Sequence, residues 1–313
     1  MSAILNITGP IFLIVGLGYL SVRVGLFQKS DMRIVGRFVM LVALPALLFN
    51  ALASRAFSDI VHYDYIAVYV LGSAVPMIGM LLWQRRRGAT PARAGMAALG
   101  SSCPNSGFVG FPIMLLTMPH IAPVVLALNM VAENFFSLPA AMAYSERKPG
   151  EHGHWGQALL HGLRPLRTNP LFMAIVAGGV WSALGWSLPI MVERSVSVLA
   201  HAAGGAALFA IGGGLVGLSL KGLRRMVAWI TFAKLIVHPL STAVFAWWVI
   251  PIEDPQLRVA AVLSTAMPML GVYPILASRV GEEDMASAAL LATTIGAFFT
   301  LSGLLLVLGL GGQ

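Results

Sequence analysis

The chain has 313 residues, of which 58% are hydrophobic and 10% charged, and its mean hydropathy is +0.84. Soluble globular proteins carry about 25% charged residues, so this composition excludes a water-soluble domain and predicts an integral membrane protein. The formal net charge is +8. Because no basic stretch is interleaved with aromatic residues, we expect no nucleic-acid partner.

Ten apolar stretches follow one another along the chain. Each has the length needed to cross a bilayer as a helix, about 20 mainly apolar residues. They cover residues 4–22, 34–53, 63–83, 94–116, 119–144, 169–187, 195–219, 226–250, 257–278 and 285–310. The predicted fold is an all-α integral membrane protein with ten transmembrane helices in a lipid bilayer.

Most Lys and Arg residues lie in alternate loops between these stretches. The odd-numbered loops are rich in them, whereas the even-numbered loops contain only Arg55, Arg194 and Arg258. Cytoplasmic loops carry an excess of Lys and Arg. We therefore expect the odd loops to be cytoplasmic and both termini to lie on the non-cytoplasmic side of the inner membrane.

A polar connection at residues 146–168 separates five apolar stretches from five others. We expect residues 1–145 and 169–313 to form two five-helix repeats joined by a cytoplasmic linker. An odd number of spans in each half gives the halves opposite orientations. Such inverted repeats are a common construction of secondary transporters.

Two of the stretches contain a polar run that breaks the helix near its middle. The fourth has Pro104 within residues 101–107, and the ninth has Pro268 followed by Pro274. Proline removes a backbone donor, and non-helical backbone at membrane depth requires surrounding protein or water. Breaks in corresponding helices of two halves predict a binding site near the midplane. The alternative is that both prolines form ordinary kinks.

The half-helix after each break points its amides into this predicted site, and the positive end of its dipole favours an anion. We expect Asn105 and Ser102 to hydrogen-bond a carboxylate there. The candidate substrate-binding residues are Ser102, Pro104, Asn105, Ser106, Gly107, Pro268, Met269, Gly271 and Tyr273.

Residues 102–112 (SCPNSGFVGFP) resemble the fourth-helix motif of the auxin efflux carrier family, whose bacterial members include malonate transporters. Residues 232–239 (FAKLIVHP) are similar to the eighth-helix signature of that family. Residues 44–49 and 277–279 are similar to two of its shorter motifs. The resemblance extends over all ten predicted spans.

This resemblance implies a ten-helix inverted-repeat fold related to the bile acid sodium symporters, with crossing helices 4 and 9 at the substrate site. It also implies a homodimer in which helices 1, 2, 6 and 7 form a scaffold and the others move as an elevator. Family members that carry auxin have an asparagine beside the first crossing proline, matched here by Asn105. Plant members have another at the second crossing, where this chain has Met267 and Met269.

Three ionisable side chains lie deep within predicted spans. Glu133 is near the centre of the fifth, and Lys234 and His238 share one face of the eighth. A charge at the centre of a membrane helix costs about 2.5–3.5 kcal/mol on insertion scales. Glu133 and Lys234 therefore either couple transport to a proton or to the substrate charge, or form a structural ion pair. For His238 a structural hydrogen bond is favoured.

These observations favour a secondary transporter of small organic anions, such as malonate or auxin-like carboxylates. No metal site or cofactor is expected, because the single cysteine, Cys103, belongs to no CxxC or His/Cys cluster. The chain also has no HExxH or GxSxG motif, so we expect no enzyme activity. The alternatives are a sodium-coupled symporter of the bile acid type and, less favoured, a channel.

Overall fold

The computed structural model describes residues 2–55, 60–147, 168–217 and 224–309, and these residues form helices and no β-strand. In the first half the α-helices are α1 (Ser2–Arg23), α2 (Lys29–Phe38), α3 (Leu44–Ala53), α4 (Tyr63–Arg86), α5 (Pro91–Ser102), α6 (Phe111–Thr117), α7 (Ala122–Ala132) and α8 (Leu138–Ser145). In the second half they are α10 (Pro170–Ala183), α11 (Ile190–Gly214), α12 (Arg224–Phe232), α13 (His238–Val244), α14 (Pro255–Thr265), α15 (Tyr273–Ser278) and α16 (Glu283–Val307).

The described helices have the length and surface of a membrane protein. Six continuous helices are long and apolar enough to cross a bilayer, and three shorter apolar ones accompany them. Large apolar side chains such as Met191 and Trp248 are 78% and 74% exposed, as expected for a surface in contact with lipid. An all-helical membrane protein is thus confirmed. Ten spans and an inverted repeat stay predictions, and residues 148–167 of the predicted linker lie outside the described residues.

In the described part of the chain, five short π-helical segments interrupt or end the α-helices. They are η1 (Val39–Ala43), η3 (Ser106–Gly110), η4 (Glu133–Ser137), η6 (Ala233–Val237) and η7 (Phe245–Val249). In each case the next residue donates its amide to the carbonyl five positions back, and a proline then follows. A proline ring clashes with the carbonyl four residues before it, and we attribute the widened turns to this clash. Pro10 and Pro76 lie within helices without such a turn.

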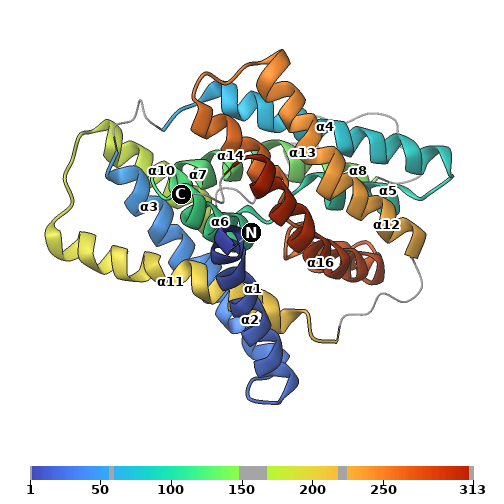
Figure 1. Ribbon diagram of the computed structural model, residues 1–313, viewed down its shortest axis with the longest axis horizontal. Helices are drawn as coiled ribbons and strands as arrows, with labels where there is room; N and C mark the ends of the chain where they lie inside the picture. The colour runs from blue at the N-terminus through green and yellow to red at the C-terminus, as the bar shows by residue number, and fades with distance from the viewer. Residues whose placement is uncertain (1, 56–59, 148–167, 218–223, 310–313) are drawn as a thin grey trace.

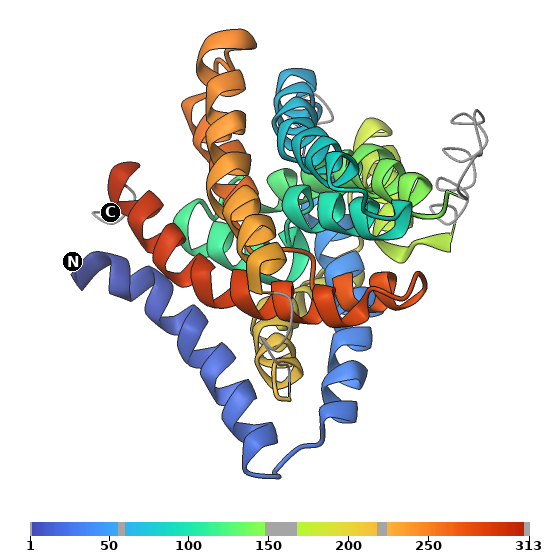
Figure 2. The same ribbon diagram turned by 90° about the vertical axis from the view of Figure 1, so that its right-hand side faces the viewer.

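The helices pack as two groups around a centre that contains both breaks. In the first group α11 runs along α1, α2 and α3, while α10 packs on α3. In the second, α4 contacts α5 and α13, α5 contacts α8, and α12 contacts α16. Figure 1 shows the first group at the left and bottom, the second at the right, and α6 and α7 near the centre. In Figure 2, α1 and the segment Lys29–Ala53 form the two arms of a V.

Glycines bring α1 and α11 into backbone contact. A Cβ atom added at Gly212 of α11 would overlap the carbonyl oxygen of Val15, and one at Gly18 of α1 would overlap the carbonyl of Phe209. Small residues allow this close approach in membrane helices, where van der Waals packing drives association. By contrast, a Cβ at Gly205 of the same helix would meet nothing within 4 Å.

We expect Gly212→Ala to lower the free energy of unfolding by about 1–3 kcal/mol, because the added methyl group forces two backbones apart. Gly205→Ala is the matched control, and its effect should stay within about 1 kcal/mol, with helix propensity favouring alanine. Thermal unfolding of the detergent-solubilised protein measures both. Equal melting temperatures for the two variants would contradict the predicted contact.

Candidate functional site

The two breaks lie against each other and pair their backbones. The amide of Asn105 donates to the carbonyl oxygen of Pro268 at 2.8 Å, and the amide of Leu270 donates to the carbonyl oxygen of Cys103 at 3.1 Å. Pro104 and Met269 thus face each other in an antiparallel bridge. Two segments far apart in sequence, each opened by a proline, thereby satisfy part of each other's backbone.

The helices that lead into the breaks begin in the same way. Thr90 caps α5 by accepting the amide of Arg93 at 3.2 Å, and Asp254 caps α14 by accepting the amide of Gln256 at 2.7 Å. A proline occupies the first helical position in both, where its missing N–H is not needed. Both helices are short, with 12 and 11 residues, and both end at a break.

Asn105 occupies the centre of this arrangement and is 3% exposed. Its Oδ1 accepts the amide of Phe108 at 3.1 Å, which caps the π-helical segment η3. Its Nδ2 lies 3.1 Å from the position that a Cβ atom of Gly271 would take. Among the described residues, this Nδ2 has no hydrogen-bond acceptor, so it is a donor available to a ligand at the paired breaks.

Two other predicted site residues use their hydroxyl groups within the protein. The Ser102 hydroxyl donates to the carbonyl of Ala98 at 2.8 Å, and the Tyr273 hydroxyl donates to the carbonyl of Met96 at 2.7 Å. The ring of Tyr273 fits over Gly100, where a Cβ would lie 2.8 Å from the phenol oxygen. Both groups fix α5, and a role for Ser102 in binding a carboxylate stays a prediction.

Glu133 holds the first residue after the break. It is the first residue of η4 and is 3% exposed. Its Oε1 accepts the Tyr69 hydroxyl at 2.6 Å and also makes a short hydrogen bond with the Ser106 hydroxyl. Ser106 begins η3, so this carboxyl group links α4 and η4 to the half-helix that starts at the break.

Helix α4 carries a stripe of hydroxyl groups at four-residue spacing, Tyr65, Tyr69 and Ser73, which places them on one face. The Tyr65 hydroxyl donates to Asn129 at 2.8 Å, and Asn129 donates to Ser264 at 2.9 Å. Ser264 lies just before the second break. The tyrosine rings stack with their centroids 6.1 Å apart. The sequence analysis missed this stripe, although its spacing within an apolar span was the signal that could have revealed it.

Lys234 and Glu133 do not form the structural ion pair that was one of the two predicted alternatives. The Lys234 ammonium group is fully buried and donates to the carbonyl of Thr265 at 2.6 Å, while Glu133 is bound by hydroxyl groups. His238 Nε2 lies 2.9 Å from the Ser73 hydroxyl, which is the kind of structural bond favoured for it. Its Nδ1 has no partner among the described residues.

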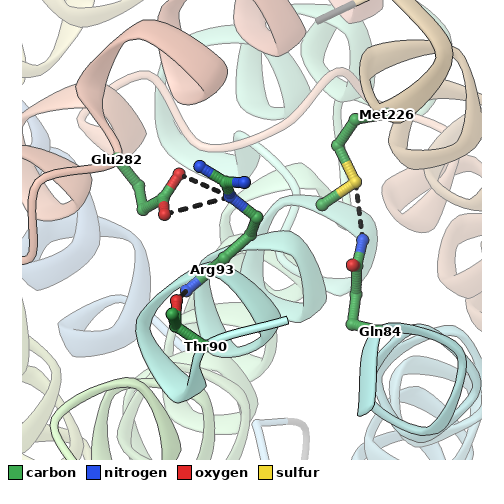
Figure 3. Close-up of polar contacts among 5 residues, drawn as sticks. All are labelled: Gln84, Thr90, Arg93, Met226 and Glu282. Carbon is green, nitrogen blue, oxygen red and sulfur yellow. Dashed lines mark hydrogen bonds and ion pairs between the residues drawn. The ribbon is translucent and has the colours of Figure 1, made fainter. Parts of the chain in front are cut away.

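The ion pair that the described residues do form lies at the other end of α5. Arg93 Nε is 3.1 Å from both carboxylate oxygens of Glu282, which precedes α16 (Figure 3). The neighbouring Gln84 amide, at the end of α4, contacts the Met226 sulfur of α12. The ion pair joins the start of α5 to the second half of the chain, and the Gln84 contact does the same for the end of α4. No group of three or more potential metal ligands occurs in the described ranges.

An apolar cavity adjoins the paired breaks. Its walls come from α1, α11 and α16 on one side and from Val109 and Pro268 of the breaks on the other, and Thr294 is its polar lining residue. This cavity has room for about one water molecule, and Asn105 is not among its lining residues.

Two paired helix breaks at the polar centre of an all-helical membrane protein are typical of membrane transporters. Comparison with known proteins identifies the family. The family model described as "Membrane transport protein" matches residues 4–136 and 157–305. The chain therefore belongs to this family, and its predicted resemblance to the auxin efflux carriers is confirmed.

Individual relatives match along almost the whole chain. A protein of Rhizobium meliloti named "Putative malonate transporter" is 29% identical over 326 residues, which cover 99% of this chain and 98% of the relative. An "Uncharacterized transporter YfdV" of Escherichia coli is 26% identical over 92% of each chain. An "Uncharacterized transporter" of Methanothermobacter thermautotrophicus is 25% identical over 91% of this chain and 92% of the relative.

Tyr69 bonds to Glu133 and Tyr65 does not, so we expect their substitution by phenylalanine to lower the free energy of unfolding by different amounts. Tyr69→Phe should lower the free energy of unfolding by about 1.5–3 kcal/mol, since the lost donor binds a carboxyl group. Tyr65→Phe removes a bond to a neutral amide and should cost about 0.5–1.5 kcal/mol.

Thermal unfolding in detergent measures both tyrosine variants, alone and combined with Glu133→Gln. In that background the cost of Tyr69→Phe should fall toward that of Tyr65→Phe, because the two residues of the pair are coupled. A Tyr65→Phe cost as large as that of Tyr69→Phe in the wild-type background would refute the assigned contacts.

Proposed function

We propose that this protein is a secondary transporter that moves small organic anions, mono- or dicarboxylates such as malonate, across the cytoplasmic membrane. The observation that carries the proposal is the Asn105 Nδ2 group. It is a nearly buried donor without an acceptor among the described residues, at the point where two broken helices meet. A buried donor of this kind favours a ligand that supplies an acceptor oxygen.

The electrostatics next to Asn105 support an anion as the ligand. The continuous helix Ser106–Thr117 begins directly after the first break, and the first amides of a helix lack intrahelical partners. The positive end of the helix dipole adds to this potential. A carboxylate at this place would accept hydrogen bonds from the Asn105 side chain and from the amides of Ser106 and Gly107.

The apolar wall next to the breaks supports an organic ion over an inorganic one. Val109 and Pro268 provide that wall, against which a methylene group would pack. The relative from Rhizobium meliloti carries malonate in its name. A short dicarboxylate with one methylene group is therefore our first test substrate, and indole-3-acetate, with its large ring, is the second.

For the transport cycle we propose alternating access around the paired breaks, with two inverted five-helix repeats and ten spans. The packing supports a division between a group containing α1, α2, α3, α10 and α11 and a group containing α4, α5, α8, α12 and α13. The first would be the scaffold of a homodimer, and the second would move. Both termini would lie outside the cytoplasm, and Glu133 would carry the coupling proton because it binds the first residue after the break.

Uptake of radiolabelled malonate and indole-3-acetate into proteoliposomes tests this proposal. We expect saturable uptake of one of these acids by the wild-type protein and at least about a tenfold loss in Asn105→Ala, because about 1.4 kcal/mol of binding energy corresponds to a factor of ten. Asn134→Ala is the matched control, because the Asn134 amide bonds to the carbonyl of Met130 in its own helix. This variant should keep its uptake. Folded protein that moves neither acid would contradict the proposal.

Imposed gradients in the same vesicles distinguish the modes of coupling. Proton coupling through Glu133 predicts that a pH gradient drives uptake by the wild-type protein. In Glu133→Gln, uptake should no longer depend on the pH gradient. Dependence on a sodium gradient would favour a symporter of the bile acid type instead, and flux that does not saturate would favour a channel.

A further inference from the structure

A buried lysine of the protein itself binds the C-terminal end of α14. Lys234, in the π-helical segment η6, is 0% exposed, and its Nζ donates to the carbonyl oxygen of Thr265 at 2.6 Å. Thr265 is the last residue of α14, directly before the second break. The ammonium group therefore lies at the end of the first half of a broken helix.

The carbonyl that Lys234 binds depends on a donor from outside its own helix. The last carbonyls of a helix have no intrahelical partner and carry partial negative charge. Here the amide of Ala266 turns back to Val262 and Leu263, and the amide of Met267 turns back to Ser264. The carbonyl of Thr265 receives its hydrogen bond from Lys234.

No carboxylate lies within ion-pair distance of Lys234 among the described residues. The buried carboxyl group of Glu133 accepts hydrogen bonds from Tyr69 and Ser106 instead. The immediate counter-charge of the ammonium group is thus the helix end. In broken-helix transporters, half-helix C-terminal ends and unwound carbonyls are the groups that coordinate a coupling cation.

We propose that Lys234 is a tethered cation, whose ammonium group occupies the place that an exchangeable monovalent cation would otherwise take at the end of α14. Lys234 lies within η6, the widened turn that precedes Pro239, and its side chain is buried there. The consequence of this inference is that the second break is stabilised without a sodium ion. Only this consequence rests on the proposed transporter function.

Two substitutions that remove the same charge test the proposal. Lys234→Ala shortens the side chain and leaves room for a cation, whereas Lys234→Met fills the space with an apolar chain of similar length. Unfolding is followed in detergent with a thiol-reactive dye that reports exposure of the buried Cys103, the single cysteine of the chain. The salts compared are the chlorides of sodium, propylammonium and N-methyl-D-glucamine, the last of which is too large to enter.

We expect sodium or propylammonium to raise the melting temperature of Lys234→Ala by roughly 5 °C in a saturable manner, relative to N-methyl-D-glucamine. The wild-type protein and Lys234→Met should show no such difference. The proposal is overturned if Lys234→Ala responds no more than Lys234→Met, or if the wild-type protein responds as strongly as Lys234→Ala.

Lys234→Ser covers the case in which Lys234→Ala does not fold, since it leaves similar room and adds an oxygen ligand. If neither small variant folds in sodium or propylammonium chloride while Lys234→Met does, the proposal is also overturned, because a free cation then fails to replace the ammonium group. No substrate enters this experiment, so its outcome is independent of whether malonate or another anion is transported.

Discussion

An unpaired backbone amide or carbonyl costs several kcal/mol in hydrocarbon, and the centre of this molecule depends on how two broken helices meet that constraint. Each break loses helical hydrogen bonds at a proline, and the two breaks then pair with each other through Asn105, Pro268, Cys103 and Leu270. Side chains form hydrogen bonds with other backbone groups at the breaks. Lys234 binds the carbonyl of Thr265, and Asn105 caps the segment that follows the first break.

The remaining polar groups are arranged around this pairing. Tyr69 and Glu133 hold Ser106 on one side of the first break, and Tyr65 with Asn129 reaches Ser264 before the second. Because α4 contributes both tyrosines, it connects the two breaks through side chains. The buried carboxyl group of Glu133 is thus part of a hydrogen-bond network that reaches both breaks.

The sequence predicted the parts of the structure that follow from composition and from proline chemistry. Hydropathy located the helices, and Pro104 and Pro268 located the breaks. Tyr65 and Tyr69 were missed because a tyrosine in an apolar span is as compatible with lipid contact as with a buried bond. The hydrogen-bond partners of Glu133 and Lys234 were not predictable, because contacts between spans depend on tertiary packing, and each side chain bonds to a neutral group. A proline follows each π-turn, but Pro10 and Pro76 lie in helices without one, so proline alone did not locate these turns.

Formation of a disulfide across the two breaks tests this account most directly. Cys103 lies opposite Leu270 in the antiparallel bridge, where Cα atoms are about 4.5–5.5 Å apart, within the range that a disulfide requires. In membranes treated with a permeant oxidant, Leu270→Cys should form an intramolecular disulfide with Cys103, detected by mass spectrometry, and Leu276→Cys on α15 should not. Equal cross-linking of both variants, or none in folded Leu270→Cys, would show that the breaks are not paired as described.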